Sequence, residues 1–227
     1  MKKISSKFFL IMPLVVALLL TIAFYMIFIF APEESTQGAV QRIFYFHVSC
    51  AFAMYCGFGL AGIYSVLFLL KRQPHFDHYS HAGASVGFLF CSMVLASGPI
   101  WAKPIWGTWW TWDPRLTTTL LIWLIFFACL LLRRFFERDP RGPVYAAVLT
   151  LFGVLDIPLI ALSVKLWRGV HPAVLGKKSN MPLEMKLTLL ATNVTVLVLF
   201  FAIFWIRVRL LKLEHKSEML RFEHQEN

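Results

Sequence analysis

Six long apolar segments, separated by short polar links, constrain this chain more than any other feature of its sequence. Each is close to the roughly 20 residues that a helix needs to cross the hydrocarbon core of a bilayer. In lipid, a helix satisfies the backbone hydrogen bonds of a single segment internally. The sequence therefore predicts an all-α membrane protein, a bundle of six transmembrane helices. The expected spans cover residues 8–30, 43–70, 82–101, 116–132, 144–164 and 183–206.

The composition agrees with a chain that lies mostly in lipid. Of its 227 residues, 59% are hydrophobic and only 15% are charged, whereas about a quarter are charged in soluble domains. Six spans and their links leave no room for a separate soluble domain, so we expect residues 1–227 to form a single polytopic membrane domain. The first apolar run, residues 8–30, exceeds the roughly 7–15 apolar residues of a signal peptide. We therefore expect it to be a retained span.

The distribution of Lys and Arg predicts the orientation. Cytoplasmic links of membrane proteins carry an excess of these residues, and most of the 22 here lie inside if both termini are cytoplasmic. This places the tail 207–227 in the cytoplasm and a Trp-rich loop, residues 101–115, on the periplasmic face. The orientation in the membrane thereby accounts for the formal charge of +10. We therefore expect lipid, and no nucleic acid, as a partner.

The last outer link, residues 165–182, is basic although it lies outside. One interpretation of this link is a solvated loop. The alternative is a patch that binds an anionic ligand group or an acidic partner domain. The basic residues of the link are Lys165, Arg168, Lys177 and Lys178.

Half of the eight tryptophans lie within residues 106–112 of the Trp-rich loop, directly before Asp113, Pro114 and Arg115. An interfacial aromatic belt would place Trp and Tyr singly at helix ends. This cluster is denser, which favours a shaped loop or short interfacial helix that acts as a platform for a flat, apolar ligand. An aromatic membrane anchor is the alternative. The four residues are Trp106, Trp109, Trp110 and Trp112.

Two histidines are expected on the same side as the tryptophans. His47 lies at the outer edge of the second span, and His171 lies in the last outer link, where Pro172 favours extended backbone. Neutral imidazole is the usual axial ligand of haem iron. Two imidazoles beside an aromatic floor therefore predict a site for a planar metalloporphyrin. Its propionates would pair with Arg42, Arg115 or the basic residues of the last link.

Other residue patterns leave rival functions to be weighed. We find no Ser-His-Asp set, paired carboxylates or nucleotide-binding loop, so we expect no enzyme. The four cysteines form no CxxC or CxxCH motif, which argues against a thiol-redox site and covalent haem attachment. The rivals are a b-type haem electron-transfer protein and a transporter for another small molecule. A transporter would use Asp156 in the fifth span, which is otherwise a helix–helix hydrogen-bonding residue or a proton site.

Three motifs resemble one known family. Residues 106–113, WGTWWTWD, match the WGxxWxWD signature of the haem-handling, WWD-domain membrane proteins of cytochrome c maturation. Residues 41–48 and 163–171 resemble the two histidine motifs of its small branch, the haem exporter protein C (CcmC) type. Ser49 and Pro172 depart from the usual residues, although both histidines are retained. The resemblance covers essentially the whole chain.

The resemblance implies a specific function. His47 and His171 would be axial ligands of haem b, held without a covalent bond as transferred cargo. The four tryptophans and Asp113 would form the platform, and Arg42 and Arg115 would pair with propionates. The implied function is delivery of haem to the periplasmic chaperone CcmE from the bacterial inner membrane. The implied partners are the ATP-binding cassette subunits CcmA and CcmB, which would hold any ATPase activity, and the single-span subunit CcmD.

Overall fold

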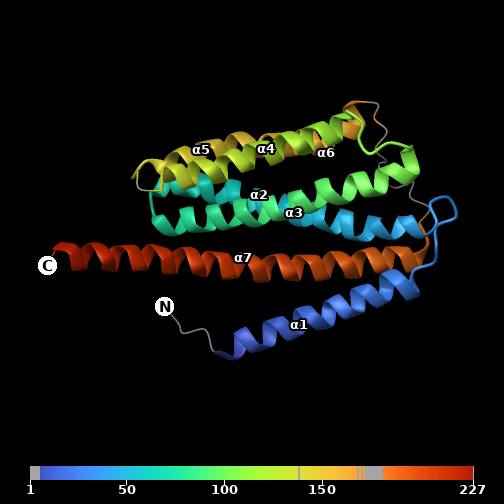
Figure 1. Cartoon of the computed structure of the whole chain (residues 1–227), viewed down its shortest axis with the longest axis horizontal. Coiled ribbons are helices and arrows are strands. Elements are labelled where there is room, and N and C mark those ends of the chain that lie inside the picture. The colour runs from blue at the N-terminus through green and yellow to red at the C-terminus, as the bar shows by residue number, and fades with distance from the viewer. Residues whose placement is uncertain (1–5, 138, 168, 170, 172–180, 227) are drawn as a thin grey trace. The chain divides into compact units, whose positions relative to one another are not determined.

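Every named element of the structure, a computed structural model, is a helix. The structure describes residues 6–137, 139–167, 169, 171 and 181–226. Among these residues, six helical segments are long and apolar enough to cross a membrane, which confirms the expected fold class. Figure 1 shows the elements, which are α1 (Ser6–Tyr25), η1 (Met26–Phe30), η2 (Ala39–Gln41), α2 (Arg42–Lys71), α3 (Pro74–Trp106), α4 (Pro114–Phe135), α5 (Gly142–Val154), α6 (Asp156–Leu166) and α7 (Leu183–Glu226).

The contacts between described residues divide the chain into two compact units. Unit 1 comprises residues 6–53, 93–111 and 181–202. Unit 2 comprises residues 54–92, 112–137, 139–167, 169, 171 and 203–226. Helices α2, α3 and α7 each contribute residues to both units, and each unit is considered by itself below.

Helix α3 is longer at both ends than the span expected at residues 82–101. It begins at Pro74, because proline suits the first helical position and Asp77 lies in the first turn. It continues through Pro99 to Trp106, as membrane helices tolerate proline. Gly107 then ends it with a positive φ of 75° and an N–H bond to the carbonyl of Lys103 at 3.0 Å.

The fifth span, expected at residues 144–164, is divided between two helices. Helix α5 ends at Val154 and α6 begins at Asp156. Pro158 lacks the N–H that would bond the carbonyl of Val154 in a continuous α-helix. In unit 2, both helices pack against α4 (Figure 1). The break lies next to Asp156, which is the only acidic residue of this span. The side chain of Asp156 is buried.

In unit 2, α2 and α3 approach closely through three glycines, Gly57, Gly83 and Gly87. A Cβ atom on Gly57 would lie 2.5 Å from the Cα of Gly87, and one on Gly83 would lie 2.8 Å from the carbonyl oxygen of Gly57. Small residues at a membrane helix interface allow this backbone contact. Beside it, the rings of Phe58 and Phe126 stack with centroids 3.8 Å apart. The interface therefore has no room for an added methyl group.

We expect Gly57→Ala to lower the stability of the protein, whereas Gly59→Ala should not. Both changes gain the same helix propensity, about 1 kcal/mol. A Cβ on Gly59 meets no atom within 4 Å, so the difference between the variants isolates the packing cost, about 1–3 kcal/mol. Thermal unfolding in detergent measures this difference. Equal midpoints for the two variants would show that the α2–α3 contact is looser than described.

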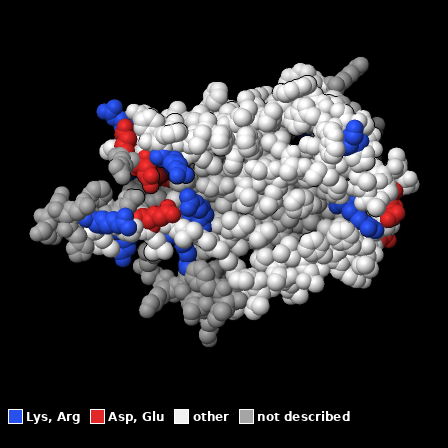
Figure 2. Space-filling view, viewed as in Figure 1, with Lys and Arg blue, Asp and Glu red and all other residues white. Residues whose placement is uncertain are grey.

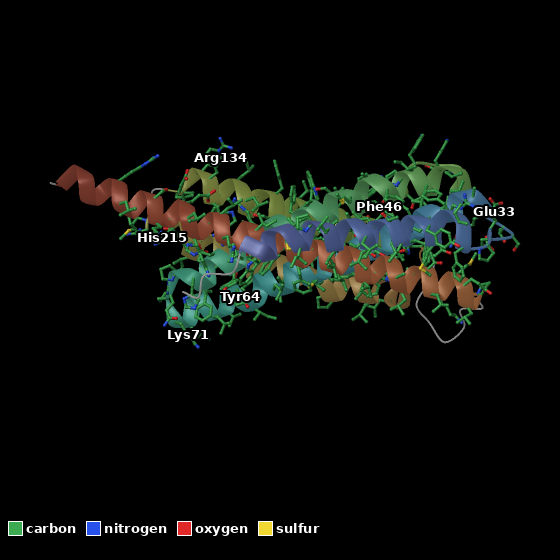
Figure 3. All side chains as sticks on the ribbon, turned by 90° about the horizontal axis from the view of Figure 1, so that it is seen from below. Glu33, Phe46, Tyr64, Lys71, Arg134 and His215 are labelled. Atoms are coloured by element: carbon green, nitrogen blue, oxygen red, sulfur yellow. The ribbon has the colours of Figure 1, made fainter. Side chains whose placement is uncertain are left out.

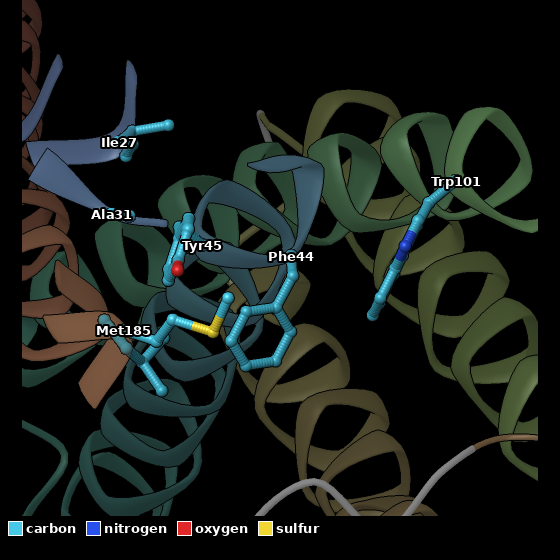
Figure 4. Close-up of a cluster of buried hydrophobic side chains, with 7 residues drawn as sticks. Ile27, Ala31, Phe44, Tyr45, Trp101 and Met185 are labelled. Carbon is cyan, nitrogen blue, oxygen red and sulfur yellow. The ribbon is translucent and has the colours of Figure 1, made fainter. Parts of the chain in front are cut away.

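The core of unit 1 fixes the start of α2. Phe44 and Tyr45 are buried among residues of η1, α3 and α7 (Figure 4), and the Phe44 ring lies 5.9 Å from that of Trp101. Thr195 of α7 donates a hydrogen bond to the carbonyl of Leu19 in α1 at 3.3 Å. The other members of this core are Ile27, Ala31, Met185 and Leu189. These contacts hold the first turns of α2, which carry His47.

Charged side chains form clusters on the face drawn in Figure 2. In unit 2, Arg133 of α4 donates to Asp77 of α3 at 2.8 Å, and both side chains are largely buried. Lys212 of α7 donates to the hydroxyl of Tyr79 at 3.3 Å, and Tyr79 stacks on Tyr64, which Figure 3 labels. Polar contacts thus join α3 to α4 and α7 in unit 2.

Candidate functional site

His47 lies in the second turn of α2 with only 8% of its surface exposed. Its Nδ1 is 2.9 Å from the hydroxyl of Ser97, and its ring centroid is 5.7 Å from that of Trp101. A Cβ on Gly98 would lie 3.4 Å from the Cε1 of His47. Ser97 and Trp101 are four residues apart and therefore share a face of α3. One helix thus supplies the polar contact, the close approach and the aromatic wall around this imidazole.

A short turn before α2 holds Trp101 in place. The indole N–H of Trp101 donates to the side-chain carbonyl of Gln37 at 3.0 Å. The Glu34 carboxylate accepts from the backbone N–H groups of Thr36 and Gln37 at 3.0 and 2.7 Å. Gly38 completes the turn with a positive φ of 57° and an N–H bond to the carbonyl of Glu34. The ionised carboxylate therefore organises the residues that anchor the wall of the His47 site.

We expect this turn to loosen in acid. The backbone N–H of Gln37, assisted by that of Thr36, lowers the pKa of Glu34 from its ordinary value of 4.5. The contribution of the turn to stability is therefore present above pH 4.5 and is lost as the pH falls through the lower folded-state pKa. Hydrogen exchange of residues 34–38 should show protection at neutral pH that disappears in strong acid. Glu34→Gln should remove this pH dependence. Unchanged protection of the wild type in acid would contradict this role of Glu34.

The Trp-rich stretch forms a loop between α3 and α4. Lys103 holds the start of this loop. The Nζ of Lys103 donates to the carbonyl of Gly107 at 2.9 Å and lies 5.9 Å from the ring centroid of Trp109. Trp109 and Trp112 are 57% and 76% exposed, so their indoles present large apolar surfaces. Trp106 ends α3. Of the four tryptophans, unit 1 contains Trp106, Trp109 and Trp110, and unit 2 contains Trp112.

In unit 2, Asp113 joins the start of α4 to the segment that carries His171. Its carboxylate accepts from the backbone N–H of Arg115 at 2.9 Å, which caps α4, and from that of His171 at 3.5 Å. Asp113 is buried. A Cβ on Gly169 would overlap this carboxylate, since it would lie 2.9 Å from the Cγ of Asp113. The final residue of the WGTWWTWD motif is therefore a structural tie, and glycine at position 169 allows its close contact.

Arg115 lies beside the imidazole of His171. Its Nη1 is 3.4 Å from the Nδ1 of His171. Because a guanidinium has only donors, Nδ1 must be the acceptor in this contact. The sequence predicted both residues for one site, and unit 2 brings them together with Asp113.

Arg42 has a carboxylate partner within unit 1. Its Nη2 lies 3.5 Å from Glu33 Oε1, in the link before α2 (Figure 3). Its guanidinium also lies 5.7 Å from the ring centroid of Phe28. An anionic ligand group would therefore have to compete with Glu33 for this arginine.

The sequence-predicted site residues fall into two groups. His47 and Arg42 belong to unit 1, and His171, Asp113 and Arg115 belong to unit 2. Sequence reasoning missed Ser97, Gly98 and Gly169. No local sequence pattern connects Ser97 with His47, which lies fifty residues earlier. Gly169, two residues before His171, does indicate that the backbone there lies close to another group. Of the basic residues of the last outer link, Arg168, Lys177 and Lys178 lie outside the described residues, as does the side chain of Lys165.

Residues 1–223 match the family model described as Heme exporter protein C. The chain belongs to this family. It is 31% identical to the heme exporter protein C of Haemophilus influenzae over 200 residues, which are 85% of this chain and 80% of that protein. It is also 31% identical to that of Bradyrhizobium diazoefficiens over 192 residues, which are 84% and 71% of the two chains.

A mitochondrial protein of Arabidopsis thaliana is also similar. It is named as a putative cytochrome c biosynthesis ccmC-like protein and is 30% identical over 183 residues, which are 80% of this chain and 69% of that protein. Membership of the family confirms the resemblance inferred from the tryptophan and histidine motifs. The chain is a multi-pass membrane protein and a transport-type subunit that acts in haem delivery during cytochrome c maturation.

Proposed function

We propose that this protein holds haem b at the periplasmic face of the bacterial inner membrane, with His47 and His171 as the two axial ligands. The observation that carries the proposal is the environment of His47. A buried imidazole lies at the end of a membrane helix, against the ring of Trp101. Iron bound there would lie near the membrane boundary, beside apolar aromatic surface. A porphyrin has a planar apolar body that matches such a surface.

The contacts in unit 2 suit the polar edge of the same ligand. Arg115 presents a guanidinium beside His171, and a guanidinium binds a carboxylate through two parallel hydrogen bonds. A propionate on Arg115 would therefore lie close to the second imidazole. The exposed indole of Trp112 belongs to this unit as well. In this proposal, the exposed indoles of the loop form the platform under the porphyrin.

The two histidines differ in what faces their Nδ1 atoms. The Nδ1 of His171 accepts a hydrogen bond from Arg115, which places the proton of the imidazole on Nε2. Binding of iron through Nε2 therefore requires the ring proton to move to Nδ1, which breaks the contact with Arg115. A propionate that binds Arg115 in its place would allow this change. We infer that His171 is the ligand that forms last and is displaced first. Displacement of one axial ligand would open the iron to a histidine of the chaperone.

Delivery in this proposal needs no covalent chemistry by the chain itself. Haem is held by two coordinate bonds and by packing, so the chaperone CcmE can take it as cargo. The ATPase activity would reside in the CcmA and CcmB subunits, with CcmD as the small single-span partner. The proposal places the Trp-rich loop on the periplasmic side, as the distribution of Lys and Arg predicts.

Haem titration of the purified full-length protein tests this function. We expect a low-spin absorption spectrum to develop as haem is added, and Asp156→Asn should leave it unchanged. A transporter for another small molecule would instead lose its activity when Asp156, a buried carboxylate in a membrane helix, is replaced, and would tolerate changes at His47 and His171. A wild-type protein that stays colourless after addition of haem would overturn the proposal.

A further inference from the structure

Ser97 is a buried hydroxyl group in the unit 1 part of α3. It is only 7% exposed, and its Oγ makes two kinds of contact. It lies 2.7 Å from the carbonyl oxygen of Met93, four residues earlier in the same helix. It also lies 2.9 Å from Nδ1 of His47 on α2. The second contact joins two helices.

The first contact decides the direction of the second. A carbonyl oxygen can only accept, so the single hydroxyl hydrogen of Ser97 is donated to Met93. The lone pairs of Oγ remain for His47, and Nδ1 must then be the donor. A neutral imidazole carries one proton. If that proton is on Nδ1, the lone pair that can bind a metal is on Nε2.

We propose that Ser97 is a positioning residue that holds His47 in the Nδ1–H tautomer and presents its Nε2 atom as the iron ligand. This inference rests on the proposed function, since it takes His47 to be a ligand. Metal-bound histidines usually donate their other N–H to an oxygen, which fixes the tautomer and the ring orientation. Here the serine acts before haem arrives. His47 is therefore prepared for ligation, whereas the Nδ1 of His171 faces a donor, Arg115.

Ser92 on the same helix provides a matched control. Its hydroxyl also donates to the carbonyl four residues earlier, that of Phe88, at 2.9 Å. It also accepts from a ring N–H, that of Trp123, at 2.8 Å. Ser92 therefore reproduces both bonds of Ser97, with an indole in place of the imidazole. Ser92→Ala loses the same kind of helix contact without touching His47.

The first test is nuclear magnetic resonance of the full-length protein with ¹⁵N-labelled histidine and no haem. The His47 signals are identified by their absence in His47→Gln. We expect a protonated Nδ1 and an unprotonated Nε2 in the wild type. A wild-type His47 with its proton on Nε2 would overturn the inference directly, whether or not any variant folds.

The second test is haem affinity measured by absorption titration. Loss of an outer hydrogen-bond partner typically weakens metal binding by about 10- to 100-fold, and we expect Ser97→Ala to fall in this range. Ser97→Thr, which keeps the hydroxyl, should restore most of the affinity, and Ser92→Ala should bind as the wild type does. Unchanged affinity in Ser97→Ala would refute the role of Ser97 while leaving the proposed function intact. A wild type that binds no haem would instead refute the proposed function.

Discussion

His47→Ala is expected to abolish the low-spin haem spectrum of the purified protein, and His171→Ala is expected to convert it to a spectrum with one protein ligand. In the proposed function each change removes an axial ligand, which would be the strongest bond between the chain and the iron. We expect the haem affinity to fall by more than about 100-fold in His47→Ala, beyond the range for loss of an outer partner. The measurement is an absorption titration of full-length protein in detergent.

His75→Ala is the control for these two variants. His75 lies in the first turn of α3, is exposed and belongs to unit 2. Its removal should change neither the spectrum nor the affinity, because it is absent from both groups of site residues. If His47→Ala keeps a wild-type spectrum while remaining folded, the ligand assignment is wrong.

Gly169→Ala is expected to lower haem affinity by about 10- to 100-fold without a change to either histidine. The added Cβ would overlap the carboxylate of Asp113, which cannot retreat freely because it also caps α4. The segment that carries His171 must therefore shift away. Overpacking of this kind costs about 1–3 kcal/mol, and each 1.4 kcal/mol corresponds to about tenfold in affinity.

Gly59→Ala serves as the control for Gly169→Ala, since a Cβ there meets no atom within 4 Å. Gly59→Ala should therefore keep the haem affinity of the wild type. The haem affinities of the two variants should differ. Wild-type affinity in Gly169→Ala would mean that the contact between Asp113 and the His171 segment does not position the ligand.

The helices could be predicted from the sequence because the cost of unpaired backbone groups in lipid dominates the fold. The errors lie at helix ends. Pro74 and Asp77 are ordinary signals for a helix start, yet the polar residues that follow suggested a link. At the other end of α3, Pro99 and Pro104 suggested a loop, although the helix continues to Trp106. Proline ends helices more reliably in soluble proteins than in membrane proteins.

The residues of the candidate site could be predicted in part. The sequence predicts Asp113, Arg115 and His171 for one site, and unit 2 brings all three together. The role of Asp113 as a helix cap was missed, although aspartate before proline is a known start signal. Ser97 could not be found, because only the packing of α2 against α3 brings it to His47. Contacts between distant helices depend on their relative rotation, which hydrophobicity does not specify.

The central claim is that two imidazoles of this chain bind one iron. Electron–nuclear double resonance of the ferric haem complex, prepared with ¹⁵N-labelled histidine in the full-length protein, tests it most directly. We expect couplings from two histidine nitrogens in the wild type and from one in His171→Ala. A wild-type complex with one coupled histidine nitrogen, or with none, would contradict the account.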